Sequence, residues 1–98
     1  MARKIVWSRK ASQSFDKILE YIIFKFGETS GIKFVQNVDF VINQISFHPF
    51  LGKLEESQYK FRSIIISKKT SLIYSVEVDS IFVYNFFDHR LHPSKKFK

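Results

Sequence analysis

The chain has 98 residues, of which 45% are hydrophobic and 17% aromatic, with 12 phenylalanines and no cysteine. One domain of this size can bury a bulky core, and the lack of cysteine excludes disulfides and thiolate metal sites. No apolar run approaches the roughly 20 residues that span a bilayer, and because no apolar stretch follows the charged N-terminal residues we expect no signal peptide. The formal net charge of +7 favours an anionic partner, although charge alone does not choose among nucleic acid, an acidic protein segment and a membrane surface.

Two amphipathic helices are predicted after a short N-terminal strand at Lys4–Ser8, whose last residue is suited to cap a helix. Apolar residues recur at helical spacing through Ala11–Phe26, and Gly27 then supplies the positive φ that often ends a helix. A second helical pattern occupies Ser30–Phe47, with Thr29 or Ser30 as its cap, and it stops before a proline. The short link predicts an antiparallel helical hairpin.

Three short strands follow a loop at Pro49–Ser57. They are Tyr59–Ser67 (YKFRSIIIS), Ser71–Glu77 (SLIYSVE) and Ile81–Asp88 (IFVYNFFD), each rich in aromatic and β-branched residues and separated by polar breaks. The third is apolar on both faces, which favours a place in the sheet interior. The predicted fold is α+β in the order β-αα-βββ, with the helical hairpin on one face of a small, mainly antiparallel sheet.

We expect one domain over residues 1–98, with residues 91–98 forming a flexible basic tail. The matching helical and strand periodicities predict one buried cluster between the hairpin and the sheet. Its expected members are Trp7, Ile18, Ile22, Val38, Ile42, Ile73 and Val83.

Basic residues give the strongest functional pattern. Lys60 and Arg62 are expected to share one face of the first meander strand, and Arg90 lies just past the last strand. The meander allows these three cations to converge near one edge of the sheet, where they could hold a phosphate. The alternative is that each is an ordinary solvated surface charge.

Asp88, His89 and His92 offer three potential metal ligands within five residues. Side chains at the end of a strand point in diverging directions, and the sequence offers no further cluster to complete a coordination sphere. We therefore expect no metal and no cofactor.

The order of these segments resembles the RelE/ParE toxin superfamily of bacterial type II toxin–antitoxin systems. The resemblance covers nearly the whole chain, from KIVWS through YIIFKFG, YKFR and SLIYSVE to IFVYNFFDHRLHP, and its most telling parts are LIYSV and DHRLHP. It implies a RelE/ParE-like fold, a cytoplasmic location and an antitoxin encoded by a neighbouring gene. With a net charge of +7 on this chain, that antitoxin should be acidic.

The superfamily holds two activities. RelE-like members cut messenger RNA on the ribosome without a metal, and ParE-like members poison DNA gyrase. If the chain is RelE-like, the resemblance implies that Lys60, Arg62, Arg90 and His92 are catalytic. The sequence departs from the RelE-like pattern at Ser71, where the nucleases usually carry arginine.

The serine and the long helical hairpin both favour the ParE-like branch. We therefore expect a gyrase-inhibiting toxin that an antitoxin neutralises, with Arg90 and the tail lysines Lys95 and Lys96 as its contact surface. One alternative is a RelE-like ribosome-dependent endoribonuclease acting on messenger RNA. Outside the family, the alternative is a small basic nucleic-acid-binding module.

Overall fold

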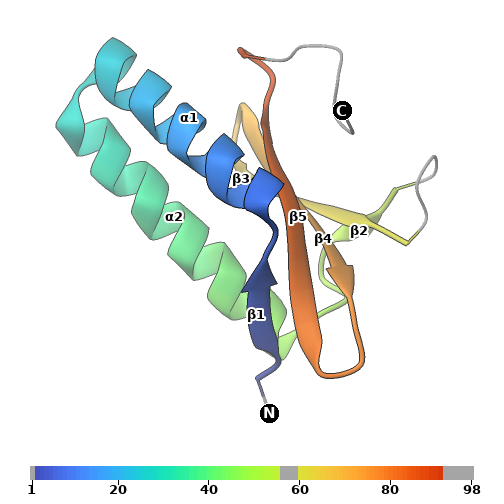
Figure 1. Ribbon diagram of the computed structural model, residues 1–98. Helices are drawn as coiled ribbons and strands as arrows, with labels where there is room; N and C mark the ends of the chain where they lie inside the picture. Colours follow the sequence, from blue (N-terminus) through green and yellow to red (C-terminus); the bar gives the residue numbers. More distant parts are fainter. Residues whose placement is uncertain (1, 56–59, 92–98) are drawn as a thin grey trace.

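The computed structural model describes residues 2–55 and 60–91. Within these two ranges the chain forms two helices and a five-stranded sheet, and the helices lie side by side on one face of that sheet (Figure 1). The predicted α+β architecture is therefore confirmed. The predicted tail beyond Leu91 lies outside the described residues.

The helical hairpin turns at a single glycine. Helix α1 (Arg9–Phe26) begins where the Ser8 hydroxyl accepts a hydrogen bond from the Ala11 N–H at 2.9 Å, as predicted. It ends at Gly27, whose φ of 94° is the positive value expected for a helix-ending glycine. Helix α2 (Glu28–Phe47) starts at the next residue without a side-chain cap, so the prediction of a longer link and a Thr29 or Ser30 cap was wrong.

The sheet order is β1-β5-β4-β3-β2, with β1 parallel to β5 and the other pairings antiparallel. The strand of the IFVYNFFD segment, β5, lies in the sheet interior between β1 and β4, as expected. The short strand β2 arises within the segment that was predicted to be a loop. The strand bounds are Lys4–Trp7 (β1), Lys53–Leu54 (β2), Arg62–Ser67 (β3), Thr70–Val76 (β4) and Ser80–Asp88 (β5).

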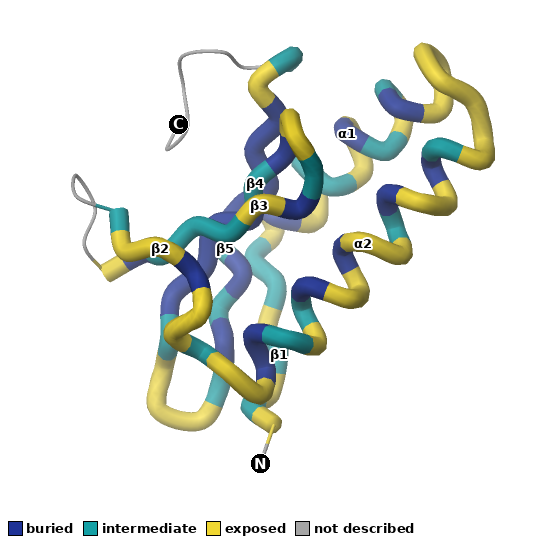
Figure 2. The backbone as a smooth tube through the Cα atoms, turned by 180° about the vertical axis from the view of Figure 1, so that it is seen from behind, coloured by how far each residue is buried: buried dark blue, intermediate teal, exposed yellow. Residues whose placement is uncertain are grey.

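The main core lies between the helices and the sheet (Figure 2). Of its predicted members, Ile18, Ile22, Val38 and Val83 are buried in it, and Trp7 and Ile42 pack partly buried against it. Ile73 is also fully buried but does not belong to this cluster. Its neighbours Leu72 and Tyr74 do, and because side chains alternate along a strand, Ile73 lies on the opposite face of the sheet.

Two serines fasten α1 to the irregular part of β5. The Ser8 hydroxyl donates to the Tyr84 carbonyl at 2.7 Å, and the Ser14 hydroxyl accepts from the Phe86 N–H at 3.0 Å. Between these two contacts the pairing of β5 with β4 shifts register. The serines therefore satisfy backbone groups where a bulge interrupts the regular ladder.

Candidate functional site

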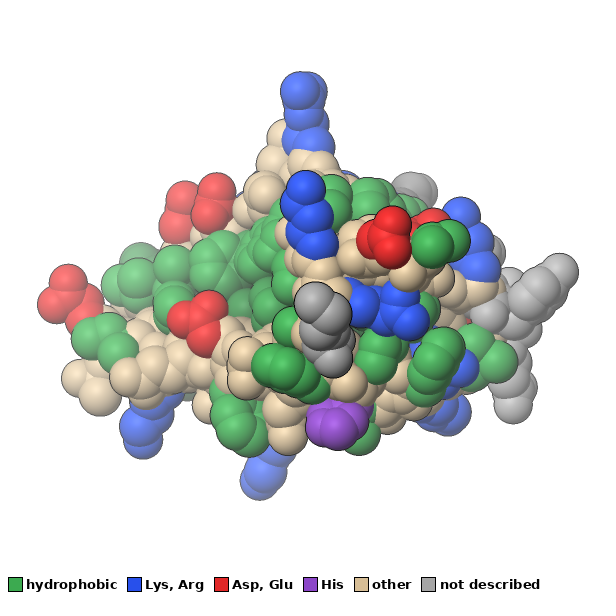
Figure 3. All heavy atoms as spheres, turned by 90° about the horizontal axis from the view of Figure 1, so that it is seen from below, with side chains coloured by type: hydrophobic (Ala, Val, Ile, Leu, Met, Phe, Trp, Pro, Cys, Tyr) green, Lys and Arg blue, Asp and Glu red, His purple; other side chains and the backbone are tan. Residues whose placement is uncertain are grey.

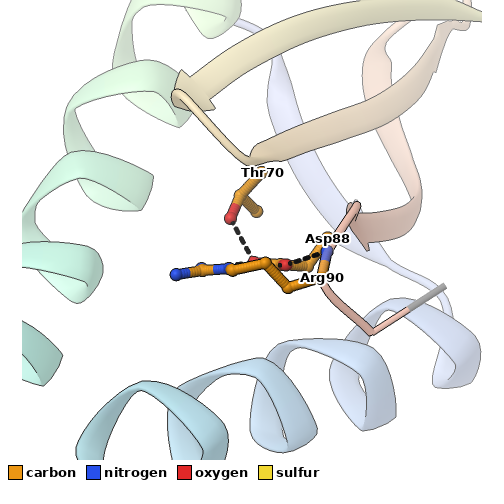
Figure 4. Close-up of polar contacts among 3 residues, drawn as sticks. All are labelled: Thr70, Asp88 and Arg90. Atoms are coloured by element: carbon orange, nitrogen blue, oxygen red, sulfur yellow. Dashed lines mark hydrogen bonds and ion pairs between the residues drawn. The ribbon is translucent and has the colours of Figure 1, made fainter. Parts of the chain in front are cut away.

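Arg90 is held in place by the last residue of β5. Its guanidinium donates to both carboxylate oxygens of Asp88, from Nε to Oδ1 at 2.9 Å and from Nη2 to Oδ2 at 2.6 Å (Figure 4). The Thr70 hydroxyl donates to Oδ2 at 2.8 Å, and the Arg90 N–H donates to Oδ1 at the same distance. On the helix side, the guanidinium lies 5.2 Å from the ring centre of Tyr21 and 5.6 Å from that of Phe26.

The Asp88 carboxylate stays charged although its side chain is completely buried. The side chain of its partner Arg90 is 25% exposed. Burial by itself raises the pKa of Asp88, but hydrogen bonds from Arg90 and Thr70 outweigh burial and leave this pKa below its ordinary value. The hydrogen bonds of the Arg90 guanidinium to Asp88, together with the charge of that carboxylate, raise the pKa of Arg90. The contacts therefore form a local ion pair that joins the end of β5 to the start of β4 and to α1.

Arg62 holds a different part of the chain, the loop between α2 and β2. Its Nη1 donates to the Gly52 carbonyl at 2.9 Å, and its guanidinium lies 5.0 Å from the Phe50 ring centre. The buried Tyr74 hydroxyl completes this arrangement: it donates to the Pro49 carbonyl at 2.7 Å and accepts from the Gly52 N–H at 2.8 Å. Burial raises the pKa of Tyr74, which keeps the hydroxyl protonated as a donor.

The remaining predicted site residues are placed differently from expectation. Lys60 precedes β3, is exposed and lies 5.2 Å from the Phe61 ring centre, so the predicted stripe of Lys60 and Arg62 along one strand was wrong. Ser71 lies half-buried in β4 between Ile65 and Phe87. His92, Lys95 and Lys96 lie outside the described residues.

The sheet register keeps Arg62 and Arg90 apart. Arg62 is opposite Tyr74, whereas Asp88, which binds Arg90, is opposite Thr70 at the other end of β4. Four residues of strand correspond to roughly 13 Å along the sheet. The three cations therefore do not converge on one phosphate position in this structure, and two of them are already engaged in internal contacts.

An apolar groove runs between the helices near their turn. It has a volume of about 420 Å³ and is lined by Leu19 and Ile23 of α1 and by Gly31, Ile32 and Val35 of α2. Viewed from below, apolar side chains are exposed on the side of the helices, and Lys and Arg side chains lie both within the visible face and around its outline (Figure 3). The structure thus exposes apolar surface on its helices in addition to its basic residues.

Metal-binding and membrane-spanning features are absent from the described part of the chain. Among residues 2–55 and 60–91, no three His, Cys, Asp or Glu side chains lie close enough to hold a metal ion. Neither described helix combines the length and the apolar character that crossing a membrane requires.

Comparison with known families decides the classification. The family described as "ParE toxin of type II toxin-antitoxin system, parDE" matches residues 5–91. The chain belongs to this toxin family. Comparison with curated proteins found no match to the sequence.

Solved structures share the fold of this ParE-family chain. The toxin structure titled "Chromosomal ParDE TA system from P. aeruginosa" has a TM-score of 0.75 at 18% identity and covers 89% of this chain and 96% of its own. The "YoeB/ParE toxin from Agrobacterium tumefaciens" has a TM-score of 0.66 at 17% identity, with coverages of 88% and 98%. A chain of the "E. coli DinJ-YafQ toxin-antitoxin complex" reaches 0.63 at 11% identity, covering 96% and 100%. At these identities the likeness concerns the fold.

Sequence reasoning missed the residues that hold the two arginines of this ParE-family chain. Asp88 was considered only beside histidines, although its spacing from Arg90 by two positions was a usable signal for an ion pair. Thr70, Tyr21 and Tyr74 reach their partners from distant parts of the chain, so no local pattern indicated these contacts.

Proposed function

We propose that this chain is a ParE-like toxin that arrests growth through DNA gyrase and is neutralised by an acidic antitoxin encoded by a neighbouring gene. The family membership of residues 5–91 supports the toxin role. The observation that favours gyrase over RNA is the separation of Arg62 from Arg90 and the engagement of each in internal contacts. Metal-independent RNA cleavage needs cations at one scissile phosphate and a group that moves the proton of the 2′-hydroxyl.

The test is induced expression in a bacterium, with DNA breaks, filamentation and the rate of translation followed in time. The gyrase proposal expects DNA breaks and filaments before translation falls, and inhibition of supercoiling by purified gyrase. An early stop of translation with ribosome-dependent messenger cleavage would instead identify the RelE-like endoribonuclease. If the induced chain has no effect on growth, both toxin activities are ruled out, and the remaining alternative is a small basic nucleic-acid-binding module.

Two substitutions sharpen this test. Arg62→Ala should leave growth arrest in place, and Ser71→Arg should not create messenger cleavage, because a single added cation does not bring the distant Arg62 and Arg90 together. Lys17→Ala on the exposed surface of α1 is the matched control. Efficient cleavage by the wild type that Arg62→Ala abolishes would overturn the proposal.

The antitoxin part of the proposal has its own measurement. Because this chain carries a net charge of +7, its affinity for an acidic antitoxin should weaken as salt is added. Titration calorimetry with the product of the adjacent gene at low and high salt checks this expectation. An affinity that does not change with salt would contradict an electrostatic contribution.

A further inference from the structure

Strand β3 is an open sheet edge over most of its length. Its outer neighbour β2 pairs only through Lys53 with Ser63 and through Leu54 with Arg62. Within the described residues no strand lies beside Ile64–Ser67 on that side, and β2 accompanies only one end of β3 (Figure 2). Such an edge displays backbone N–H and C=O groups that can pair with another chain.

The alternation of hydrogen bonds indicates which residue of β3 faces outward. The Glu55 N–H donates to the Phe61 carbonyl at 3.0 Å, so Phe61 presents its backbone groups to the β2 side. In antiparallel pairs every second residue does so, which extends the pattern through Ser63 to Ile65, beyond the end of β2. The register irregularity of β3 lies after Ile65 and does not interrupt this pattern.

Ile65 also exposes its side chain. It is 70% exposed, whereas Ile66 is buried in the core and Ile64 packs against it. Natural edge strands are usually protected by charges, prolines or bulges that twist them away. The Ser63–Ser67 segment, SIIIS, contains no charge and no proline, and its register irregularity lies beyond Ile65. Backbone pairing groups and an apolar side chain are therefore presented together at the same point.

The charges around this edge select the kind of partner. Lys68 and Lys69 follow β3 directly, and both are exposed. If a second copy of this chain paired antiparallel around Ile65, Lys68 of one copy would lie opposite Arg62 of the other, and parallel pairing would align the lysines. Both arrangements place like charges together, which disfavours self-association. An acidic segment meets no such repulsion.

We propose that the Ile64–Ser67 edge of β3 binds an extended segment of the antitoxin as an additional strand, with acidic residues where that segment passes Lys68 and Lys69. This inference rests on the proposed function for the existence of the antitoxin. Backbone hydrogen bonds supply affinity in strand addition, and side chains beside the edge supply specificity. Here the specificity elements are the apolar contact at Ile65 and the two lysines.

The test measures the affinity of the full chain for the product of the adjacent antitoxin gene by titration calorimetry. Ile65→Pro removes an outward N–H that β4 does not use, and it should weaken binding about tenfold. Lys68→Glu with Lys69→Glu should weaken binding by at least tenfold and reduce its salt dependence. Lys4→Glu with Lys17→Glu makes the same change in charge at exposed positions elsewhere and should stay within about threefold of wild type.

Hydrogen exchange at the Ile65 amide of the wild type provides a second measurement that does not depend on whether Ile65→Pro folds. In the wild type, exchange of the Ile65 amide should slow when the antitoxin is added. If the antitoxin binds tightly but the Ile65 amide is not protected and the lysine variant binds as well as wild type, the antitoxin contacts another part of the surface. That result would overturn the edge proposal and would support the antitoxin as partner. Absence of any binding to the wild type would overturn both the antitoxin and the edge proposal. A wild-type dimer that Ile65→Pro converts to a monomer would assign the edge to self-association instead.

Discussion

Arg62 and Arg90 lie toward opposite ends of the same sheet, and their surroundings differ in how the positive charge is balanced. Arg90 faces the completely buried Asp88 carboxylate in a two-point ion pair and stacks near two rings of α1. Arg62 faces the neutral Gly52 carbonyl and the Phe50 ring. Arg90 is thus paired with a full opposite charge, whereas the described partners of Arg62 are a carbonyl dipole and a ring face.

We therefore expect Arg90 to act mainly on stability and Arg62 mainly on the electrostatic field around the protein. Removing Arg90 leaves a buried carboxylate without its cation, which is one of the most costly single changes in a folded protein. Removing Arg62 leaves a carbonyl group that carries no net charge. Among residues 2–55 and 60–91, Arg62 forms no ion pair, so its positive charge contributes more to the outer field of the protein than that of Arg90.

Arg90→Met should have the largest effect on stability. Because it leaves Asp88 unpaired inside the protein, we expect the free energy of unfolding to fall by about 3 kcal/mol, the lower part of the range for a broken buried pair, since Arg90 is 25% exposed. Urea denaturation followed by circular dichroism measures it. The double variant Asp88→Asn with Arg90→Met removes the stranded charge and should recover most of the loss. No recovery would mean that the rings of α1, and not the ion pair, make Arg90 important.

The pH dependence of stability should reveal the same ion pair without a change at Arg90. The pKa of Asp88 is lower in the folded protein than its ordinary value of 3.8, so the folded state favours the charged form. Its contribution is complete above the unfolded pKa and is lost as pH falls from there through the folded pKa. The melting temperature of wild type should therefore decline below about pH 4 more steeply than that of Asp88→Asn. Parallel curves would contradict this assignment.

Gly52→Ala tests the other end of the sheet. An added Cβ would lie 2.7 Å from the Tyr74 hydroxyl and 3.0 Å from the Ser63 carbonyl, which is part of the backbone of β3. We expect the free energy of unfolding to fall by about 2 kcal/mol, because one of these groups must move. Lys53→Ala, at the exposed neighbouring position, is the control for urea denaturation and should change little.

Arg62→Met should have the smallest effect on stability, at most about 1 kcal/mol, because only neutral hydrogen-bond partners are lost. We nevertheless expect Arg62→Met to reduce the salt dependence of association with an acidic protein. This reduction should exceed that caused by another substitution, elsewhere in the chain, that lowers stability by a similar amount. Thermal melting and calorimetry at two salt concentrations measure the two quantities. A loss of stability as large as that of Arg90→Met would remove the distinction between the two arginines.

The fold was largely predictable because its determinants are local. The helical spacing of Ile18, Ile22 and Val38 and the positive-φ glycine at Gly27 define the hairpin, and the alternation within the last three strands defines the sheet. The two-residue strand β2 was missed because it is too short to show any periodicity. Ile73 was assigned to the wrong face although β4 does alternate: Ile73 shares its face with Ser71 and Ser75, whereas Leu72 and Tyr74 face the main core.

The arrangement of the candidate site was much less predictable. Arg90 was correctly placed after the last strand, but the contact of its guanidinium with Tyr21 depends on how α1 packs on β5. Whether Arg62 and Arg90 converge depends on the register among β3, β4 and β5. Strands with apolar residues on both faces do not define that register from the sequence. Long-range geometry, which composition does not encode, therefore decides the site.

The pairing of β1 with β5 has a consequence for how the protein is made. The residues joined by this contact are far apart in sequence; the Ser8 hydroxyl and the Tyr84 carbonyl that it binds are 76 positions apart. During synthesis, β1 and the start of α1 emerge before β5, so β1 has no strand to pair with until β5 has been translated. Contacts between such distant segments form slowly, and unpaired segments wait exposed meanwhile. A chain interrupted before β5 cannot assemble this sheet, so the toxin fold is completed only after β5 has been synthesised.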